Sequence, residues 1–433
     1  MKRIIHILLI VVLFTMNLPT TSVLGSQTSE TTESTPESEA NGNTTQQPTQ
    51  EVDALNLQVR SAVLMDVDTG QVLYSKNDQI SLPPASVTKV MTMLVIMEAI
   101  EKGIVSWDDM VTTSEKAHSM TGSQVFLAIG EKATLKQMFE AIAVYSANDA
   151  AVALAEHVAG SEDLFVNLMN EKAQELGLRN TRYLNATGFP YTDRFPNFNE
   201  PSGHTMSAMD IAVISRELVS KYPDVLEHTR KTFATFQNGV NMPTRNNIML
   251  RNDWIDGLKT GFTDQAQYCL SATGEKNGFR LVSVILGAAN DRARQDETLK
   301  LLNFGFNNYE RQTMIRGKEE VKVVKVDKGK EREVALLAAQ NLNIVVDKEG
   351  KHTYNQVIEI NESIVAPILA NTVLGRVYYE RDGVMIGEPV SLVAKEDVEK
   401  AGFLRLLGRG IKDTFVGIFE GIADKILGIF SKE

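Results

Sequence analysis

The sequence has little of what several classes of protein require. It holds one cysteine, Cys269, among 433 residues, so no intramolecular disulfide can form. Cys269 stands in the apolar stretch 267–272, where a thiol usually packs as a small hydrophobic group, which argues against a cysteine nucleophile. The six histidines show no HExxH or paired ligand spacing. The sequence therefore predicts no metal site, and no motif indicates another cofactor.

The sequence also has fewer basic than acidic residues. Lys and Arg number 44 against 55 Asp and Glu, which gives a net charge of -11 at pH 7. Proteins that bind nucleic acid neutralise phosphates with an excess of Lys and Arg. We therefore expect no nucleic-acid partner.

The N-terminal apolar run, residues 4–16, is shorter than the roughly 20 residues that span a bilayer. Lys2 and Arg3 precede it, and short side chains follow near Gly25. This order is typical of a cleaved secretory signal, so we interpret residues 1–25 as a signal peptide. The alternatives are an uncleaved anchor and a buried core helix. Residues 26–53, rich in Ser, Thr, Glu and Gln, have little to bury and predict a disordered linker.

The pattern of strands and helices predicts a mixed α/β (α+β) domain over residues 54–309. Alternation predicts strands at 59–65, 71–74, 254–260, 265–273 and 279–286. Helical periodicity predicts helices at 86–100, 134–143, 149–158, 164–176, 207–220 and 292–306, the first of them capped by Ser86. Strands joined by short turns pair antiparallel, so we expect an antiparallel sheet covered by helices.

The C-terminal third has a different residue pattern. Short Val- and Ile-rich runs with charged alternation predict a small all-β domain over residues 310–396, with no chemical motif. Residues 400–433 place apolar side chains at helical spacing opposite charged ones, which predicts an amphipathic helix that lies on a membrane surface. The alternative is a helix that packs on the β domain.

Three short motifs lie in order along the domain 54–309. They are Ser86-Val87-Thr88-Lys89 at a predicted helix start, Ser146-Ala147-Asn148 in a turn between helices, and Lys259-Thr260-Gly261 on a strand. Each alone is a weak signal. Their order and context indicate three segments that meet at one site.

The first two motifs fit acyl transfer. Ser86 and Lys89 are three residues apart and share a helix face, so an uncharged Lys89 can take the Ser86 proton. The Ser86 amide, at the start of the helix, is a candidate oxyanion donor. Ser146 can relay a proton to the leaving amine, and Asn148 can orient the substrate and Lys89.

The third motif fits recognition of a carboxylate. Lys259 and Thr260 supply a cation and a hydroxyl, and Gly261 lets the strand backbone approach a ligand closely. The predicted substrate is therefore an acyl peptide that ends in a free carboxylate.

The motif triplet resembles the signature set of penicillin-binding proteins and serine β-lactamases. Within that set, residues 84–89, 145–149, 204–210 and 257–261 resemble the low-molecular-mass D-alanyl-D-alanine carboxypeptidases. The resemblance implies a β-lactamase/transpeptidase-like fold for residues 54–309, followed by the β domain and the amphipathic tail.

The resemblance also implies roles for residues. Ser86 would be the acyl-enzyme nucleophile and Lys89 the general base, with Ser146 and Asn148 as the second motif. Lys259, Thr260 and Gly261 would bind substrate, and the amides of Ser86 and Phe262 would form the oxyanion hole; Phe262 stands where the family often has another residue. The implied reaction removes the terminal D-alanine from peptidoglycan pentapeptide stems, β-lactams being covalent inhibitors. An enzyme of this kind would act at the outer face of the cytoplasmic membrane, or be secreted.

Two other functions compete with this one. A serine β-lactamase of class A needs a glutamate that directs water to the acyl-enzyme. None of the candidate glutamates in this sequence stands in an E-x-x-L-N context, and the second motif is Ser-Ala-Asn rather than Ser-Asp-Asn. These candidates are Glu162, Glu171, Glu175 and Glu200. A catalytically silent wall-peptide-binding protein is the other alternative, although every catalytic position is filled.

Overall fold

The computed structural model describes residues 55–190 and 203–406. The predicted signal peptide and linker, and all of the predicted C-terminal helix beyond residue 406, lie outside the described residues. Within the described chain no helix is long and apolar enough to cross a membrane.

One five-stranded antiparallel sheet organises the first folded part. Its strand order is β2-β1-β9-β8-β7, so strands from the two ends of this part lie side by side. The hairpin of β8 and β9 turns through Asn277 and Gly278, both with positive φ, the conformation that favours an Asn-Gly pair in a tight turn. The strands are β1 (Ser61–Asp66), β2 (Val72–Lys76), β7 (Ile255–Thr263), β8 (Gln267–Lys276) and β9 (Phe279–Ala288).

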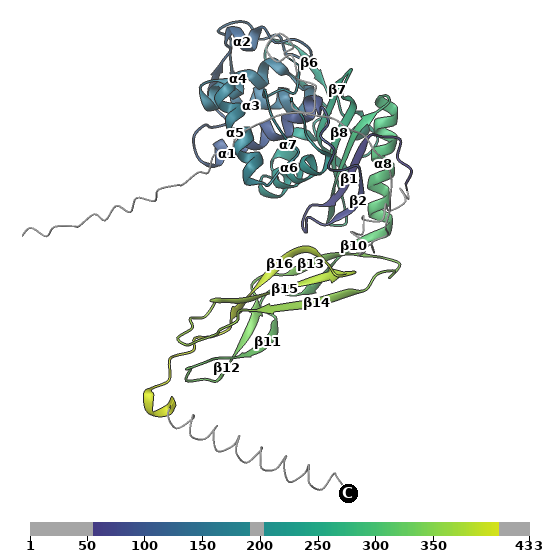
Figure 1. Ribbon diagram of the computed structural model, residues 1–433. Coiled ribbons are helices and arrows are strands. Elements are labelled where there is room, and N and C mark those ends of the chain that lie inside the picture. The colour runs from purple at the N-terminus through teal and green to yellow at the C-terminus, as the bar shows by residue number, and fades with distance from the viewer. Residues whose placement is uncertain (1–54, 191–202, 407–433) are drawn as a thin grey trace, which may run out of the picture. The chain divides into compact units, whose positions relative to one another are not determined.

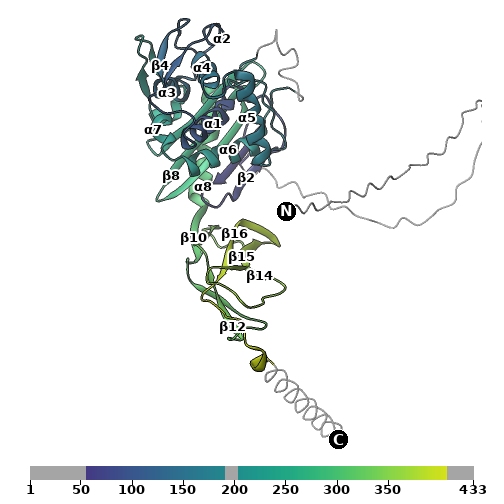
Figure 2. The same ribbon diagram turned by 90° about the vertical axis from the view of Figure 1, so that its left-hand side faces the viewer.

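Both faces of this sheet are buried because alternate side chains pack against different helices. Val63 and Met65 of β1 belong to the core with α6 (Ala208–Lys221), whereas Ala62 and Leu64 pack in the core with α8 (Asp291–Asn308). Figure 1 shows the sheet between a helical layer and α8, and Figure 2 shows the helices in front of it. The predicted antiparallel sheet with helical cover is confirmed.

The long helices were predicted within a few residues of their bounds, and two of the α-helices begin with a side-chain cap. Ser207 accepts a hydrogen bond from the Asp210 amide, and Thr134 forms a capping box with Gln137. The short elements carry little periodicity and were not predicted. The remaining α-helices are α1 (Lys89–Glu101), α2 (Glu115–His118), α3 (Leu135–Glu140), α4 (Asn148–Ala159), α5 (Glu162–Glu175) and α7 (Val225–Thr229). The small strands are β3 (Met110–Thr112), β4 (Lys132–Thr134), β5 (Phe233–Thr235) and β6 (Asn241–Pro243).

The predicted helix cap at Ser86 is wrong. Ser86 lies inside a 3₁₀ turn, Ala85–Thr88, and α1 begins only at Lys89 with no side-chain cap. Two prolines precede the turn, and Ala85 takes a left-handed φ of 48°, so the chain enters α1 through a tight 3₁₀ turn instead of a capped first helical turn.

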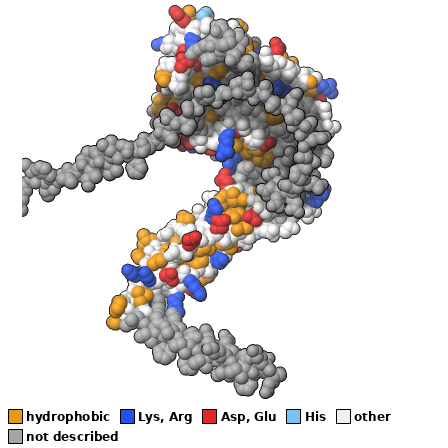
Figure 3. Space-filling view, viewed as in Figure 1, with side chains coloured by type: hydrophobic (Ala, Val, Ile, Leu, Met, Phe, Trp, Pro, Cys, Tyr) orange, Lys and Arg blue, Asp and Glu red, His pale blue; other side chains and the backbone are white. Residues whose placement is uncertain are grey.

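The second folded part is all-β, as predicted. One sheet has the order β11-β12-β16-β15-β14, and β10 pairs with β13. Leu336, Val377 and Leu392 are among its buried core side chains, while Figure 3 shows other hydrophobic side chains exposed among charged ones on these strands. The strands are β10 (Tyr309–Ile315), β11 (Glu320–Lys325), β12 (Glu333–Ala338), β13 (Leu342–Asp347), β14 (Tyr354–Ile360), β15 (Val373–Arg381) and β16 (Val384–Ala394).

Candidate active site

The three motifs meet at one cleft. It has a volume of about 780 Å³, and Ser86, Ser146, Asn148, Thr260 and Gly261 all line it. Because they come from the turn before α1, the start of α4 and strand β7, the cleft depends on the packing of distant segments. The structure thus brings the three motifs together, although Lys89 and Lys259 are buried and do not line the cleft.

Lys89 lies under the serine with its amine held by three oxygens. Its Nζ is 3.0 Å from Ser86 Oγ, 2.7 Å from Asn148 Oδ1 and 2.9 Å from the Thr187 carbonyl oxygen. Asn148 Oδ1 and the Thr187 carbonyl can only accept, so an uncharged amine donates to these two and keeps its lone pair for the Ser86 hydroxyl. The geometry suits a general base.

The charge on Lys89 is disfavoured. Its side chain is fully buried, and burial, followed by the cationic Lys259, holds the pKa of Lys89 well below its ordinary value, while Asp149 opposes the shift. A lysine in this environment can be uncharged near neutral pH and accept a proton.

The second motif follows an irregular stretch of helix. A π-helical segment, Ala141–Tyr145, ends at Ser146, which takes a left-handed φ of 68°; such segments occur frequently at functional sites. Ser146 Oγ is buried and has no hydrogen-bond partner within the described residues. Its hydroxyl is therefore available to a ligand.

Asn148 is oriented by the loop that forms one wall of the cleft. Its Nδ2 donates to the Thr121 carbonyl at 2.7 Å, and its backbone N–H donates to the Ser123 carbonyl at 2.7 Å. With Nδ2 committed to Thr121, Oδ1 faces Lys89. The predicted contact between Asn148 and Lys89 is present.

Gly261 lets β7 lie against the turn that carries the nucleophile. A Cβ on Gly261 would come within 2.7 Å of the Pro84 carbonyl oxygen and 3.1 Å of Ser86 N, distances that real Cβ atoms rarely reach. The close approach seen in the structure is to the protein's own backbone, and the approach of a ligand to Gly261 stays a prediction.

Lys259 is 2% exposed and donates to the Thr260 carbonyl at 2.9 Å. Burial, followed by the charges of Arg294 and Arg245, lowers the pKa of Lys259 to about 7. Its charge in turn disfavours protonation of Lys89. The two arginines therefore lower the pKa of Lys259, and Lys259 lowers the pKa of Lys89.

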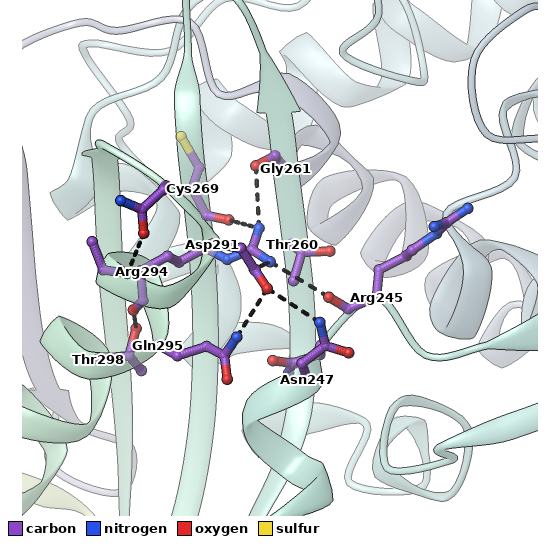
Figure 4. Close-up of polar contacts among 12 residues, drawn as sticks. Arg245, Asn247, Thr260, Gly261, Cys269, Asp291, Arg294, Gln295 and Thr298 are labelled. Atoms are coloured by element: carbon purple, nitrogen blue, oxygen red, sulfur yellow. Dashed lines mark hydrogen bonds and ion pairs between the residues drawn. The ribbon is translucent and has the colours of Figure 1, made fainter.

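Two of these cations, Arg245 and Arg294, were not predicted from the sequence. Arg245 lies over the Tyr145 ring at 4.3 Å. Arg294, from the first turn of α8, points between β7 and β8, with Nη1 3.3 Å from the Cys269 carbonyl and an ion pair to Asp291 (Figure 4). Both line the cleft beside Thr260. Neither belongs to a short motif, so only the fold reveals them.

Phe262 lies at the rim of the cleft. Its side chain is 49% exposed, and its ring centroid is 4.5 Å from that of Tyr268. Its position directly after Gly261 in β7 places its amide next in the strand that borders Ser86. The side chain adds an apolar surface to the cleft rim.

Residues 43–290 match the family model of D-alanyl-D-alanine carboxypeptidases, and residues 309–400 match that of the C-terminal domain of penicillin-binding protein 5. The D-alanyl-D-alanine carboxypeptidase DacF of Bacillus subtilis is 40% identical over 366 residues, 82% of this chain and 90% of that protein. This chain belongs to the D-alanyl-D-alanine carboxypeptidase family.

Solved structures agree with this assignment. Penicillin-binding protein 5 of Haemophilus influenzae superposes with a TM-score of 0.70 at 30% identity, covering 79% of this chain and 98% of that one. Penicillin-binding protein D2 of Listeria monocytogenes, solved in the ampicillin-bound form, superposes with a TM-score of 0.52 at 30% identity, over 58% of this chain and 99% of that one. The predicted fold and the predicted serine-type carboxypeptidase activity are confirmed.

The class A β-lactamase alternative finds no support in the cleft of this carboxypeptidase. No glutamate is among the residues that line it within the described chain. Glu162 instead accepts the Ala186 N–H at 3.0 Å and pairs with Lys116 at 2.7 Å. Glu171 and Glu175 line a separate hollow on α5, and Glu200 lies outside the described residues.

Proposed function

We propose that Ser86 is the nucleophile of this carboxypeptidase and Lys89 its general base. The observation that carries the proposal is the buried Lys89 amine, held by Asn148 Oδ1 and the Thr187 carbonyl with its third direction toward Ser86 Oγ. A depressed pKa lets that amine act as a base at neutral pH. The substrate is a peptidoglycan pentapeptide stem that ends in D-alanyl-D-alanine.

The reaction proceeds in two transfers. Ser86 Oγ bonds to the penultimate D-alanine carbonyl carbon as its proton passes to Lys89. The peptide C–N bond then breaks, and the proton reaches the leaving nitrogen through Ser146. Water next attacks the ester and gives one proton to Lys89, which passes it to Ser86 Oγ as the ester C–O bond breaks. The second proton of the water goes to solvent, and the shortened stem leaves as a carboxylate. The Ser86 and Phe262 amides stabilise the oxyanion in both steps.

The carboxylate of the substrate binds at the cationic end of the cleft. Thr260 and Arg245 line the cleft there, and Arg–carboxylate hydrogen bonds are both strong and directional. Lys259 is buried and does not line the cleft, so it acts on the bound carboxylate through its charge. Gly261 and Phe262 continue the same strand and hold the acyl part of the peptide. A carboxylate at this place positions the last peptide bond over Ser86, which explains a preference for the chain end.

The same chemistry opens a β-lactam ring, because the strained amide presents a carbonyl carbon and a carboxylate in a similar arrangement. A relative of 30% identity has been solved with ampicillin bound. We infer that β-lactams acylate Ser86 and that the acyl-enzyme is hydrolysed slowly, since no glutamate that could direct water lines the cleft among the described residues.

The test combines two assays on the protein without residues 1–53 and 403–433. Free D-alanine is measured after incubation with a diacyl-lysyl-D-alanyl-D-alanine peptide, and covalent labelling is measured with a fluorescent penicillin. The parent should release D-alanine and become labelled, and Ser86→Ala should do neither while keeping its unfolding temperature. Labelling of the folded Ser86→Ala protein would contradict the assignment of the nucleophile.

We also propose that residues 1–25 direct export, that residues 26–53 link the folded part to the processed N-terminus, and that residues 400–433 bind the outer face of the cytoplasmic membrane. The support is the amphipathic pattern of the tail. Deleting residues 403–433 should abolish co-sedimentation with anionic lipid vesicles without lowering D-alanine release. Undiminished vesicle binding by the truncated protein would refute the anchor.

A further inference from the structure

A buried hydrogen-bond chain connects the segment before α6 with the nucleophile turn. His204 is fully buried, and its Nδ1 accepts the Leu184 backbone N–H at 3.1 Å. Its Nε2 lies 2.8 Å from Thr88 Oγ1, and that hydroxyl donates to the Ala85 carbonyl at 2.9 Å. Neither His204 nor Thr88 lines the cleft, so neither can touch a substrate.

The direction of each bond in this chain is determined. Because Nδ1 accepts from a backbone N–H, the proton of a neutral imidazole sits on Nε2 and is donated to Thr88. The Thr88 proton is then free to go to the Ala85 carbonyl. Burial, followed by the charge of Lys89 when that amine is protonated, lowers the pKa of His204 to about 3, so the ring is neutral near pH 7.

The hydrogen-bond chain ends at the peptide unit that precedes the nucleophile. The Ala85 carbonyl and the Ser86 N–H belong to one planar peptide, so a hydrogen bond that fixes the carbonyl also fixes where the N–H points. Ala85 is not glycine, yet it takes a φ of 48°. A residue keeps such a conformation only where its surroundings impose it.

The neighbouring loop confirms how tightly this peptide is held. Gly188 lies directly against it, because a Cβ at that position would collide with the Ala85 carbonyl oxygen and with Thr88 Oγ1. The preceding residue of the same loop, Thr187, supplies the carbonyl that holds Lys89. One loop therefore contacts the base and the peptide of the nucleophile.

We propose that His204 is a positioning residue, which acts through Thr88 Oγ1 to fix the Ala85–Ser86 peptide plane and so to aim the Ser86 N–H at the oxyanion of the tetrahedral intermediate. The inference rests on the proposed role of Ser86 and extends it to two residues outside the cleft. Donation to the Ala85 carbonyl also polarises the peptide and makes its N–H a better donor.

Thr88→Val tests the link, because valine keeps the shape of threonine and removes the hydroxyl. Thr229→Val is the matched control: Thr229 is buried in α7 and donates to the Asp256 carbonyl at 2.8 Å, so it also loses one buried hydroxyl hydrogen bond, but it contacts neither the Ala85 peptide nor the loop of Thr187 and Gly188. Thr88→Ser keeps the hydroxyl and should restore wild-type behaviour.

Three assays are made on folded protein. They measure acylation by fluorescent penicillin, kcat and KM for D-alanine release, and the affinity of a peptide boronic acid, whose anionic tetrahedral adduct with Ser86 places a boronate oxygen in the oxyanion position. Loss of one oxyanion donor lowers kcat by about 100- to 1,000-fold, and misdirecting it should lower kcat, acylation and boronate affinity by about 10- to 100-fold, with KM little changed. Thr229→Val should lower only the unfolding temperature.

His204→Phe supplies a second, independent variant. It keeps a ring of similar shape and removes both nitrogens, so Thr88 still reaches Ala85 but is no longer held. Its loss of kcat should be smaller than that of Thr88→Val, and the double variant should lose no more than Thr88→Val alone.

Unchanged kcat and boronate affinity in Thr88→Val, or equal losses in Thr229→Val, would overturn the inference. So would losses of kcat that simply multiply in the double variant with His204→Phe. These outcomes leave the proposed function standing, since the wild-type enzyme would still be acylated. A wild-type protein that penicillin does not acylate would overturn the proposed function and this inference with it.

Discussion

Gly261→Ala should slow acylation of Ser86 more than a similar substitution elsewhere in the same sheet. The added Cβ would lie 2.7 Å from the Pro84 carbonyl oxygen, whereas ordinary contact begins at 3.4 Å, so β7 must retreat from the Ser86 turn by about 0.7 Å. The atoms it meets are backbone and cannot rotate away. Misplacement by about 1 Å can lower a rate by about 100-fold, so we expect penicillin acylation to fall by about 10- to 100-fold.

Gly274→Ala is the matched control for this change. It lies in β8 of the same sheet, and its Cβ would meet Trp254 Cε3 at 2.9 Å and the Trp254 carbonyl oxygen at 3.0 Å, away from the cleft. Each variant adds one methyl group to a filled space, so each should lower the free energy of unfolding by about 1–3 kcal/mol. Urea denaturation measures that loss, and the rate of penicillin labelling measures the site. Equal labelling rates in the two variants would refute the reasoning.

Two further changes test the groups beside the nucleophile. Ser146→Ala should lower kcat by at least about 100-fold without destabilising the fold, since the buried hydroxyl has no partner in the described chain; undiminished D-alanine release would exclude the proton relay. The pKa of Lys259 is lowered from 10.5 to about 7 in the folded protein. Between these two pH values the unfolded chain binds a proton that the folded chain lacks, so the free energy of unfolding rises with pH. Lys259→Met should weaken that rise in urea denaturation between about pH 7 and about pH 9; an identical slope would mean that Lys259 stays charged when folded.

Much of the fold could be predicted because its signals are local. Alternation of Val63 and Met65 with Ala62 and Leu64 reports a strand, and the Asn277-Gly278 pair reports the hairpin. The Ser207 cap marks where α6 begins. Ser86 shows the limit of such signals: a serine before an apolar helix indicates a cap, but the two prolines and the left-handed Ala85 produce a 3₁₀ turn instead.

The motif residues could be predicted because they occur at short, recognisable spacings in the sequence. The groups that support them belong to no such motif. Arg245, Arg294 and the Thr187 carbonyl reach the site only through the packing of loops and α8 against the sheet. A carbonyl has no signature in a sequence, and a single arginine in a helix is most often a surface charge. His204 was part of the resemblance, but its hydrogen bonds to Leu184 and Thr88 required the fold.

The central claim is that Ser86 forms the acyl-enzyme, and mass spectrometry of the penicillin adduct tests it most directly. The intact wild-type protein should gain the mass of one penicillin, and after proteolysis that mass should lie on the peptide that contains Ser86. The folded Ser86→Ala protein should gain none. A single adduct on any other residue, or an adduct on Ser86→Ala, would contradict the account.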